Sequence, residues 1–333
     1  MKKLYVLSGA SGMTGSELVH QILELEKDSR IIGFDNFFAS SIDTIKEYLD
    51  NPRFVFYEYD INNLSQMRAI EAEVSRWKIA YDKTIYINCA AVVHTEHFYE
   101  IEHTWETNVI SMKSFLEQAI RIKADIYINC STSEVYSMQS WNENGGVRES
   151  DYLMMSSAEH SQRTSYACGK LMTEFFMKDA VDKGLIKGCS IRFANVYSKH
   201  ERFAKHIIPY IINELSSKNG KVVLLENSKK NKRSFLHNID SCNAVLELMD
   251  TESALDGTVY NVATDEEISI VDLAKLISSK MGIENLQIVF DGYRASDPER
   301  RILNTDKIRT RTAWRPKVSL STGLDMCIAS IER

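Results

Sequence analysis

Two side chains on one predicted helix have the types and spacing of a proton-transfer pair. Tyr166 and Lys170 stand four residues apart in the segment YACGK. On a helix this spacing places both side chains on the same face. An ammonium near a phenol favours the phenolate, so the pair predicts a phenol with a lowered pKa that acts as a base near neutral pH.

A second segment, STSEVY at 131–136, adds a hydroxyl and a carboxylate at the end of a predicted strand. Thr132 supplies the hydroxyl, Glu134 supplies the carboxylate, and Ser133 lies between them. With the phenol of Tyr166, this set suits oxidation of a carbinol beside a nicotinamide. The carbon next to the new ketone is acidic, and a carboxylate can remove its proton as a general base.

The glycine-rich loop GASGMTG, between a predicted strand and a predicted helix, indicates a dinucleotide site. Its glycines let the backbone turn tightly and approach a pyrophosphate, which then lies on the helix N-terminus. The cofactor contacts predicted in this loop are Gly9, Ser11, Gly12, Met13, Thr14 and Gly15.

Asp35 ends the second predicted strand and indicates which dinucleotide binds. A carboxylate in this place accepts hydrogen bonds from the ribose hydroxyls and repels a 2′-phosphate, so the sequence predicts NAD rather than NADP. The other predicted cofactor contacts follow the second, third and fourth strands: Asn36, Asp60, Ile61, Ala90 and Ala91.

The first half of the chain alternates apolar runs with amphipathic stretches. The predicted strands are Leu4–Ser8, Ile31–Asp35, Phe54–Asp60, Thr84–Cys89, Ile126–Cys130 and Ser190–Ala194. Helices are predicted over Ser16–Glu26, Thr104–Arg121 and Tyr166–Val181. This alternation predicts an α/β fold of the Rossmann type, with a doubly wound parallel sheet covered by helices on both faces.

After Asn195 the alternation loosens, and an amphipathic helix is predicted over Ile268–Met281. We therefore expect a smaller, discontinuous C-terminal domain for the substrate. The expected division places 1–194 and 235–263 in the dinucleotide-binding domain, and 195–234 and 264–333 in the substrate domain.

Composition excludes several other classes of protein. The 333 residues carry a net charge of −6, which disfavours a nucleic-acid-binding role because phosphate backbones require a basic face. No apolar run reaches the length of a membrane span. The six cysteines are scattered without a CxxC pair, so we expect neither disulfides nor a metal site, and a cytoplasmic location.

A series of motifs in order resembles the extended short-chain dehydrogenase/reductase family, the NAD-dependent epimerases and dehydratases that act on nucleotide sugars. The resemblance covers nearly the whole chain. Its motifs are GASGMTG, DNFF at 35–38, NCAA at 88–91, ETNV at 106–109, STSEVY, YACGK, RFANVY at 192–197, RSF at 233–235 and DPERR at 297–301.

The resemblance assigns roles to individual residues. It implies that Thr132, Tyr166 and Lys170 form the catalytic triad. It further implies a substrate site for a sugar diphosphate, in which arginines neutralise the phosphates. The residues it assigns to that site are Asn108, Asn195, Arg233 and either Arg300 or Arg301, and His94 is added because it follows the NCAA motif.

The resemblance also implies a first step, in which Tyr166 takes the proton of a sugar hydroxyl, usually at C4, while hydride passes to NAD. Glu134 then favours removal of the C5 proton and loss of water from C6, which is 4,6-dehydration. In dTDP-glucose 4,6-dehydratases an aspartate that protonates the departing hydroxyl stands where this chain has Ser133. The order Thr-Ser-Glu is closer to GDP-mannose-type 4,6-dehydratases, and it also matches UDP-glucuronate decarboxylases.

Three alternatives stay open: C4 epimerisation, decarboxylation of a uronate, and a non-catalytic NAD-binding sensor. Two departures from the family pattern, at Ser137 and at Ser198-Lys199-His200, predict an unusual substrate pocket. Relatives dimerise through the helices that correspond to Thr104–Arg121 and Tyr166–Val181, so a homodimer is expected.

Overall fold

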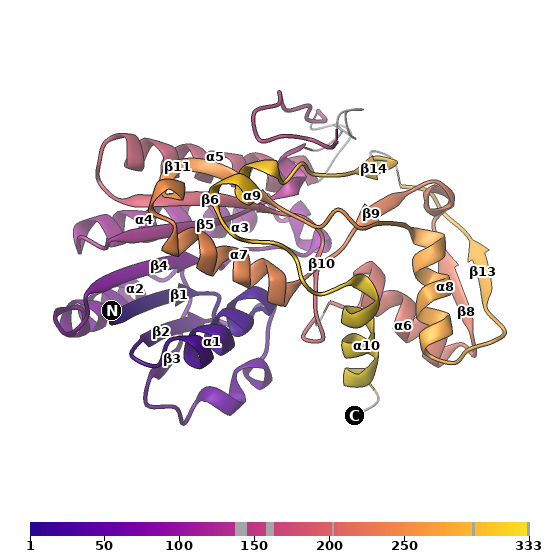
Figure 1. Ribbon diagram of the computed structural model, residues 1–333, viewed down its shortest axis with the longest axis horizontal. Helices are drawn as coiled ribbons and strands as arrows, with labels where there is room; N and C mark the ends of the chain where they lie inside the picture. The colour runs from indigo at the N-terminus through magenta and orange to yellow at the C-terminus, as the bar shows by residue number, and fades with distance from the viewer. Residues whose placement is uncertain (137–144, 158–162, 202, 295–296, 332–333) are drawn as a thin grey trace.

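The computed structural model describes residues 1–136, 145–157, 163–201, 203–294 and 297–331. One parallel sheet dominates it, with strand order β11-β6-β5-β4-β1-β2-β3 (Figure 1). The strands are β1 (Lys3–Ser8), β2 (Arg30–Asp35), β3 (Phe54–Glu58), β4 (Lys83–Asn88), β5 (Ile126–Thr132), β6 (Lys187–Phe193) and β11 (Asp256–Val262). The predicted Rossmann-type architecture is confirmed.

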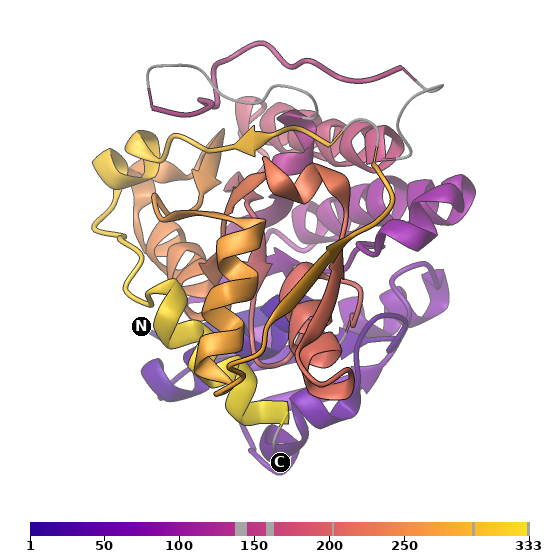
Figure 2. The ribbon, with the colours of Figure 1, turned by 90° about the vertical axis from the view of Figure 1, so that its right-hand side faces the viewer.

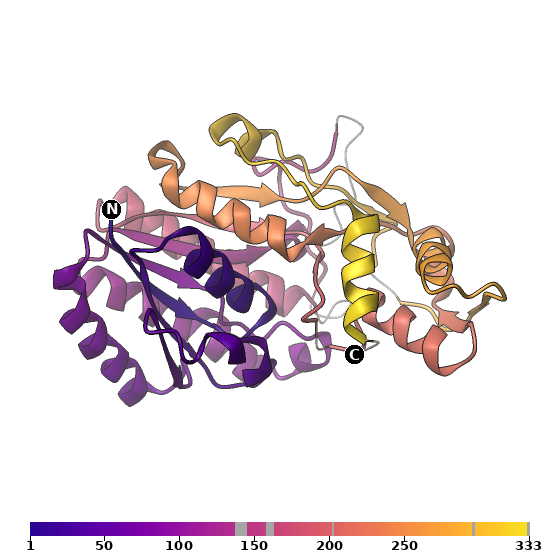
Figure 3. The same ribbon diagram turned by 60° about the horizontal axis from the view of Figure 1, so that its bottom comes forward.

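Helices cover both faces of this sheet because its strands are apolar on both sides. In β1, Tyr5 and Leu7 pack on one face, while Leu4 and Val6 pack on the other. The first face is covered by α1 (Met13–Leu25) and α7 (Asn238–Asp250), which lie beside each other in Figure 3. The second face is covered by α2 (Leu64–Trp77), α4 (Met112–Arg121) and α5 (Arg163–Asp182).

The predicted helix over Thr104–Arg121 is a composite. It consists of α3 (Ile101–Trp105), a wider π turn over Glu106–Ser111, and α4. Such turns often lie at functional sites, and this one carries the buried Asn108.

A second group of elements packs at the carboxyl ends of the strands. It has its own core, built around α6 (Ile207–Ser217), α8 (Ile270–Lys280) and α10 (Leu320–Ile331) (Figure 2). Its strands form small sheets: β8 (Lys221–Leu224) with β13 (Gln287–Phe290), and β9 (Lys232–Ser234) between β12 (Glu267–Ser269) and β14 (Arg300–Arg301).

The chain crosses between the two groups several times. β7 (Val196–Tyr197) pairs with β10 (Leu236–His237) at the crossing, and α7 and β11 then return to the large sheet. Later, α9 (Asp306–Arg311) and Trp314 also pack into the core of the large sheet. Among the described residues, no helix combines the length and the apolar character needed to cross a bilayer.

A buried polar network joins the sheet to α5 and includes the first and last residues of the STSEVY segment, Ser131 and Tyr136. Arg192 of β6 donates two hydrogen bonds to Glu174 of α5, from Nε at 2.9 Å and from Nη2 at 2.6 Å. Ser131 Oγ donates to the same carboxylate at 2.6 Å. Arg192 Nη1 also donates to the hydroxyl of Tyr136, which donates to Asn261 of β11. The network therefore connects three strands with the helix that carries Tyr166 and Lys170.

We expect Glu174→Gln to destabilise the protein strongly, because the Arg192 guanidinium would remain buried without a counter-charge. Breaking one partner of a buried ion pair costs about 3–5 kcal/mol. The free energy of unfolding in urea measures the effect. Glu247→Gln, an exposed change on α7, is the matched control and should stay within about 0.5 kcal/mol of the parent. Equal stability of the two variants would contradict this account.

Candidate active site

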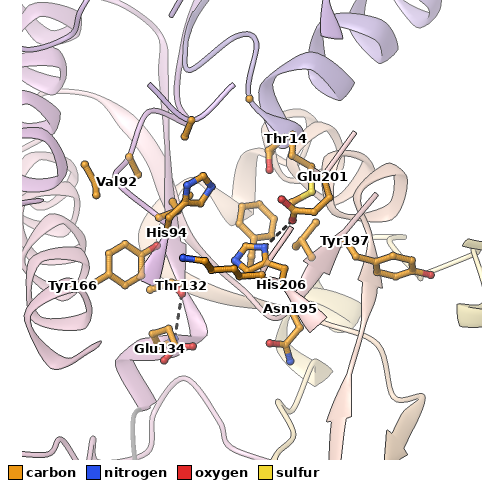
Figure 4. A pocket seen from close by; sticks show the side chains of 18 of the residues that line it. Thr14, Val92, His94, Thr132, Glu134, Tyr166, Asn195, Tyr197, Glu201 and His206 are labelled. Atoms are coloured by element: carbon orange, nitrogen blue, oxygen red, sulfur yellow. Dashed lines mark hydrogen bonds and ion pairs between the residues drawn. The ribbon is translucent and has the colours of Figure 1, made fainter. Parts of the chain in front are cut away.

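A cavity of about 750 Å³ lies where the carboxyl ends of the sheet strands meet the second group of elements (Figure 4). This is the edge at which open α/β sheets bind ligands. Most of the predicted site residues line the cavity: Gly9, Ser11, Gly12, Met13, Thr14, Gly15, Asp35, Asn36, Ile61, Ala90, Ala91, His94, Thr132, Ser133, Glu134, Tyr166, Lys170, Asn195 and Arg233. Asp60, Asn108, Arg300 and Arg301 are not among the lining residues.

The glycine loop between β1 and α1 is packed so closely that side chains would not fit. A Cβ atom on Gly15 would lie 2.0 Å from the carbonyl oxygen of Gly9. Gly9 has a φ of 68°, and a Cβ there would lie 2.8 Å from the backbone nitrogen of Ala90. Gly12 occupies the N-cap of α1 and has no side chain to cap it. The first turn of α1 therefore presents backbone N–H groups and the positive end of its dipole to the cavity, which fits a pyrophosphate.

Asp35 closes the same loop from the end of β2. Its carboxylate accepts hydrogen bonds from the backbone N–H groups of Ser11 at 3.1 Å and Phe37 at 2.9 Å. It also accepts one from Ser40 Oγ at 3.1 Å. These bonds hold the carboxylate at the cavity wall, where its remaining lone pairs suit the hydroxyls of a ribose. The loop and Asp35 together fit a dinucleotide such as NAD.

Asp60 is not one of the residues that line this cavity. β3 ends at Glu58, earlier than predicted, and Asp60 Oδ1 accepts a hydrogen bond from the backbone N–H of Asn62 at 2.8 Å. Its neighbour Ile61 lines the cavity instead.

Tyr166, Lys170 and Thr132 meet at the ends of α5 and β5. Tyr166 is buried against Phe98, with ring centroids 4.5 Å apart and the planes nearly parallel, and it lines the same cavity as Thr132. Lys170 Nζ donates to the carbonyl oxygen of Cys130 at 3.0 Å, which fixes the ammonium at the strand end. The triad implied by the sequence is therefore brought together in space.

The pKa of Tyr166 differs from the expectation. Burial raises the pKa of this phenol above its ordinary value, the negative charge of Glu134 raises it further, and the nearby hydroxyl of Thr132 lowers it. Burial also lowers the pKa of Lys170. The predicted lowering of the Tyr166 pKa is wrong for this structure, because desolvation of the buried phenol has the largest effect on it.

Glu134 follows the end of β5 on a short 3-10 turn over Ser133–Tyr136. Its backbone N–H donates to Thr132 Oγ1 at 3.2 Å, and its carboxylate accepts a hydrogen bond from Arg301 Nη1 at 2.8 Å. The side chain of Arg301 is 4% exposed, so this guanidinium is buried beside the carboxylate. Arg301 thus contacts a predicted catalytic residue.

Arg300, its neighbour in β14, is placed elsewhere. Its guanidinium binds both carboxylate oxygens of Glu267, at 3.0 and 2.9 Å. The two arginines that the sequence left as equal candidates therefore have different partners.

Of the other predicted substrate residues, Asn108 supports a loop beside the cavity, whereas Asn195 and Arg233 line the cavity itself. Asn108 is buried and uses both ends of its amide to hold the backbone of Val92, at 2.7 and 3.1 Å, so it fixes the loop after β4. Asn195 lines the cavity with a φ of 33° and donates to the carbonyl oxygen of Ser234. Arg233 also lines the cavity and is paired with Asp297 at 2.8 Å.

The structure adds a cavity-lining pair that the sequence analysis missed. His206 Nδ1 lies 2.9 Å from a carboxylate oxygen of Glu201, whose side chain is only 10% exposed. Phe203 lies between the two in sequence, and its ring stacks on His94 with centroids 4.2 Å apart. One sequence signal could have indicated this pair. The chain departs from the family pattern at Ser198-Lys199-His200, and Glu201 follows directly.

Ser137 lies outside the described residues, so its departure from the family pattern has no structural counterpart here. Within the part of the chain that the structure describes, no cluster of three His, Cys, Asp or Glu side chains is arranged as a metal site.

Comparison with known proteins gives the family. Residues 5–263 match the NAD dependent epimerase/dehydratase family. The Low-salt glycan biosynthesis protein Agl12 of Haloferax volcanii is 25% identical over 324 residues, which cover 97% of this chain and 96% of that protein. UDP-glucuronic acid decarboxylase 5 of Arabidopsis thaliana is 25% identical over 333 residues, with coverage of 96% and 87%.

The fold is also that of solved enzymes. The structure of a dTDP-glucose 4,6-dehydratase from Bacillus anthracis in complex with NAD superposes with a TM-score of 0.81 at 22% identity, covering 99% of this chain and 96% of that one. Because the family match spans most of the chain and its glycine loop, Asp35 and Tyr166 triad line one cavity, this protein belongs to the NAD dependent epimerase/dehydratase family.

Proposed function

We propose that this protein catalyses the 4,6-dehydration of a nucleotide-diphosphate hexose through a transient C4 ketone. One observation supports the proposal above the others: Glu134 lines the same cavity as Tyr166 and Thr132 and lies close enough to raise the pKa of Tyr166. A carbinol oxidised beside Tyr166 would therefore present its acidic neighbouring C–H to a carboxylate.

Tyr166 is the proposed base for the C4 hydroxyl. The hydroxyl of Thr132 is near enough to lower the pKa of this phenol, and stacking on Phe98 fixes the ring plane. The ammonium of Lys170 donates to the carbonyl oxygen of Cys130, which fixes this cation at the end of β5. When bound, NAD accepts and returns the hydride, and the positive charge of its oxidised ring favours the phenolate.

Glu134 is the proposed base for the C5 proton. A base must reach its proton and must be unprotonated when it acts. The contact with Arg301 favours the ionised carboxylate and limits its rotation. The same contact fixes the end of β14 against the catalytic turn, so the second group of elements contributes to the acid–base site.

A second candidate function, decarboxylation of a nucleotide-linked uronate, is supported by Ser133. This small, neutral residue lines the cavity beside Glu134, so the wall there carries no additional charge that would repel a substrate carboxylate. The relatives include UDP-glucuronic acid decarboxylase 5 of Arabidopsis thaliana. C4 epimerisation at the same triad, and a role as an NAD sensor, are the remaining alternatives.

We propose that the two groups of elements divide the ligands. Residues 1–194 with 235–263 would bind NAD, and 195–234 with 264–333 would bind the nucleotide sugar, with Arg233 against the diphosphate. The partly buried Arg233–Asp297 contact and the position of Arg233 in the cavity wall support this assignment.

A cytoplasmic location is also proposed, supported by six cysteines that are free thiols.

The reaction is tested by incubating the protein and NAD with UDP-, GDP-, CDP- and dTDP-hexoses and the matching uronates. We expect one hexose to lose the mass of one water, as measured by mass spectrometry. Loss of carbon dioxide from a uronate would instead establish the second candidate. An unchanged mass with altered NMR couplings would indicate epimerisation, and either result would overturn 4,6-dehydration.

We expect Glu134→Gln to lower the dehydration rate by about 100-fold or more, because an amide cannot accept the C5 proton. NAD binding, followed by calorimetry, should be unchanged because the hydrogen bonds of Glu134 are to Thr132 and Arg301 and not to the glycine loop. Tyr166→Phe is the companion variant and should stop the reaction one step earlier. A Glu134→Gln enzyme with full activity would favour an epimerase, and a Tyr166→Phe enzyme with full function would favour the sensor.

A homodimer is proposed through the exposed apolar side chains of α3, the π turn and α5. These are Ile101, Trp105, Ile110, Met172 and Phe175. We expect Phe175→Glu to give a monomer by light scattering, because it introduces a charge into an apolar contact. Leu185→Glu, at an exposed leucine beyond the end of α5, is the control and should remain dimeric. A parent protein that is monomeric would refute the proposal.

A further inference from the structure

The proposed dehydration requires an acid as well as a base. When the C5–H bond breaks, its electron pair forms the C5=C6 double bond and the C6–O bond breaks. The departing oxygen leaves readily only if it receives a proton, since hydroxide is a poor leaving group. Glu134 receives the C5 proton in this scheme and cannot donate a second one in the same step.

The groups next to the Tyr166 triad do not supply that proton well. Thr132 and Ser133 carry hydroxyls, which are far weaker acids than an imidazolium. Arg301 is committed to Glu134, to which its Nη1 donates at 2.8 Å. Lys170 is buried, and its ammonium is committed to the carbonyl oxygen of Cys130 at 3.0 Å.

A carboxylate–imidazole pair faces the same cavity from the second group of elements. Glu201 and His206 lie on the side of the cavity that carries Asn195 and Tyr197, across from Tyr166 (Figure 4). Glu201 is held in place because its other carboxylate oxygen accepts the backbone N–H of Phe203 at 3.0 Å. Its contact with His206 uses Nδ1, which leaves Nε2 for a substrate oxygen.

The wall around the pair is also fixed. The ring of Phe203 contacts the ring of His206 edge-on, with centroids 4.8 Å apart, and it stacks on His94 from the loop after β4. The ring centroids of His94 and His206 are 6.0 Å apart, again in an edge-on arrangement. The imidazole is thus held between a carboxylate and two rings, while its side chain is 41% exposed and open to the cavity. An oriented carboxylate–histidine pair of this kind is a common arrangement for proton transfer.

We propose that His206 is the general acid of this enzyme, donating its Nε2 proton to the oxygen that leaves C6, and that Glu201 is the positioning residue that orients the ring. The step balances: the C5 proton passes to Glu134, the C6 oxygen takes the His206 proton and departs as water, and solvent reprotonates the imidazole. The inference rests on the proposed dehydration.

The test compares two leaving groups in the full-length protein with NAD. The probe is the active hexose of the nucleotide panel, in its natural 6-hydroxyl form and as its 6-deoxy-6-fluoro analogue, because fluoride leaves without prior protonation. We expect His206→Asn to lose about 100-fold or more in water release but less than about 3-fold in fluoride release, in line with the size of general-acid effects. Deuterium from solvent should still enter at C5, because Tyr166 and Glu134 are intact.

Glu201→Gln should show the same selective loss to a smaller degree, about 10-fold, because the amide orients the ring without stabilising its charge. His20→Asn, on the exposed side of α1 away from the cavity, is the matched control and should resemble the parent. Circular dichroism and urea unfolding establish that each variant is folded.

Equal losses with both leaving groups would overturn the inference, since a structural role affects both alike. No loss in His206→Asn would overturn it as well. Failure of the proposed function is distinguished by the parent protein, which would then release neither water nor fluoride from any hexose of the panel.

Discussion

The buried contact between Arg192 and Glu174 is the interaction on which the site depends. It lies in the interior, where an ion pair persists only if its remaining hydrogen-bonding groups are satisfied. Here Ser131, Tyr136 and, through Tyr136, Asn261 complete the network. The contact fixes α5 against β5 and β6, and so it sets the distance between the Tyr166–Lys170 face and the STSEVY turn. An apolar core alone would leave that spacing less specified.

The catalytic cavity is formed by segments that are far apart in the chain. One wall comes from the glycine loop, the end of β5 and α5, and these elements pack on the sheet. The other wall comes from the stretch after β7 and from Arg233 of β9. Behind this wall, β14 pairs with β9, and its Arg301 contacts Glu134 although the two residues are 167 positions apart in sequence. The proposed acid, His206, and the proposed base, Glu134, therefore come from different parts of the fold.

Sequence reasoning succeeded where the determining contacts are local and failed where they are not. The helix over α5 and the YxxxK face follow from periodicity, and so did each strand of the first half to within a few residues. The choice between Arg300 and Arg301 was not predictable, because adjacent residues of a strand point to opposite sides and the pairing of β14 with β9 decides which side is which. The pKa of Tyr166 was mispredicted for a related reason: the spacing to Lys170 is local, but the burial of the phenol comes from Phe98 and the surrounding fold.

The sequence by itself determined the dinucleotide loop, the order of strands and helices, and the pairing of phenol and ammonium, because each depends on residues within a few positions of one another. Only the tertiary structure decided that Asn108 supports a loop, that Asp60 lies outside the cavity, and that Arg301 meets Glu134. It alone brought His206 and Glu201 into the same cavity as Tyr166. The physical reason is that long-range contacts are set by how helices and strands pack. A local pattern of residues does not specify which side chains of a distant helix or strand will face it.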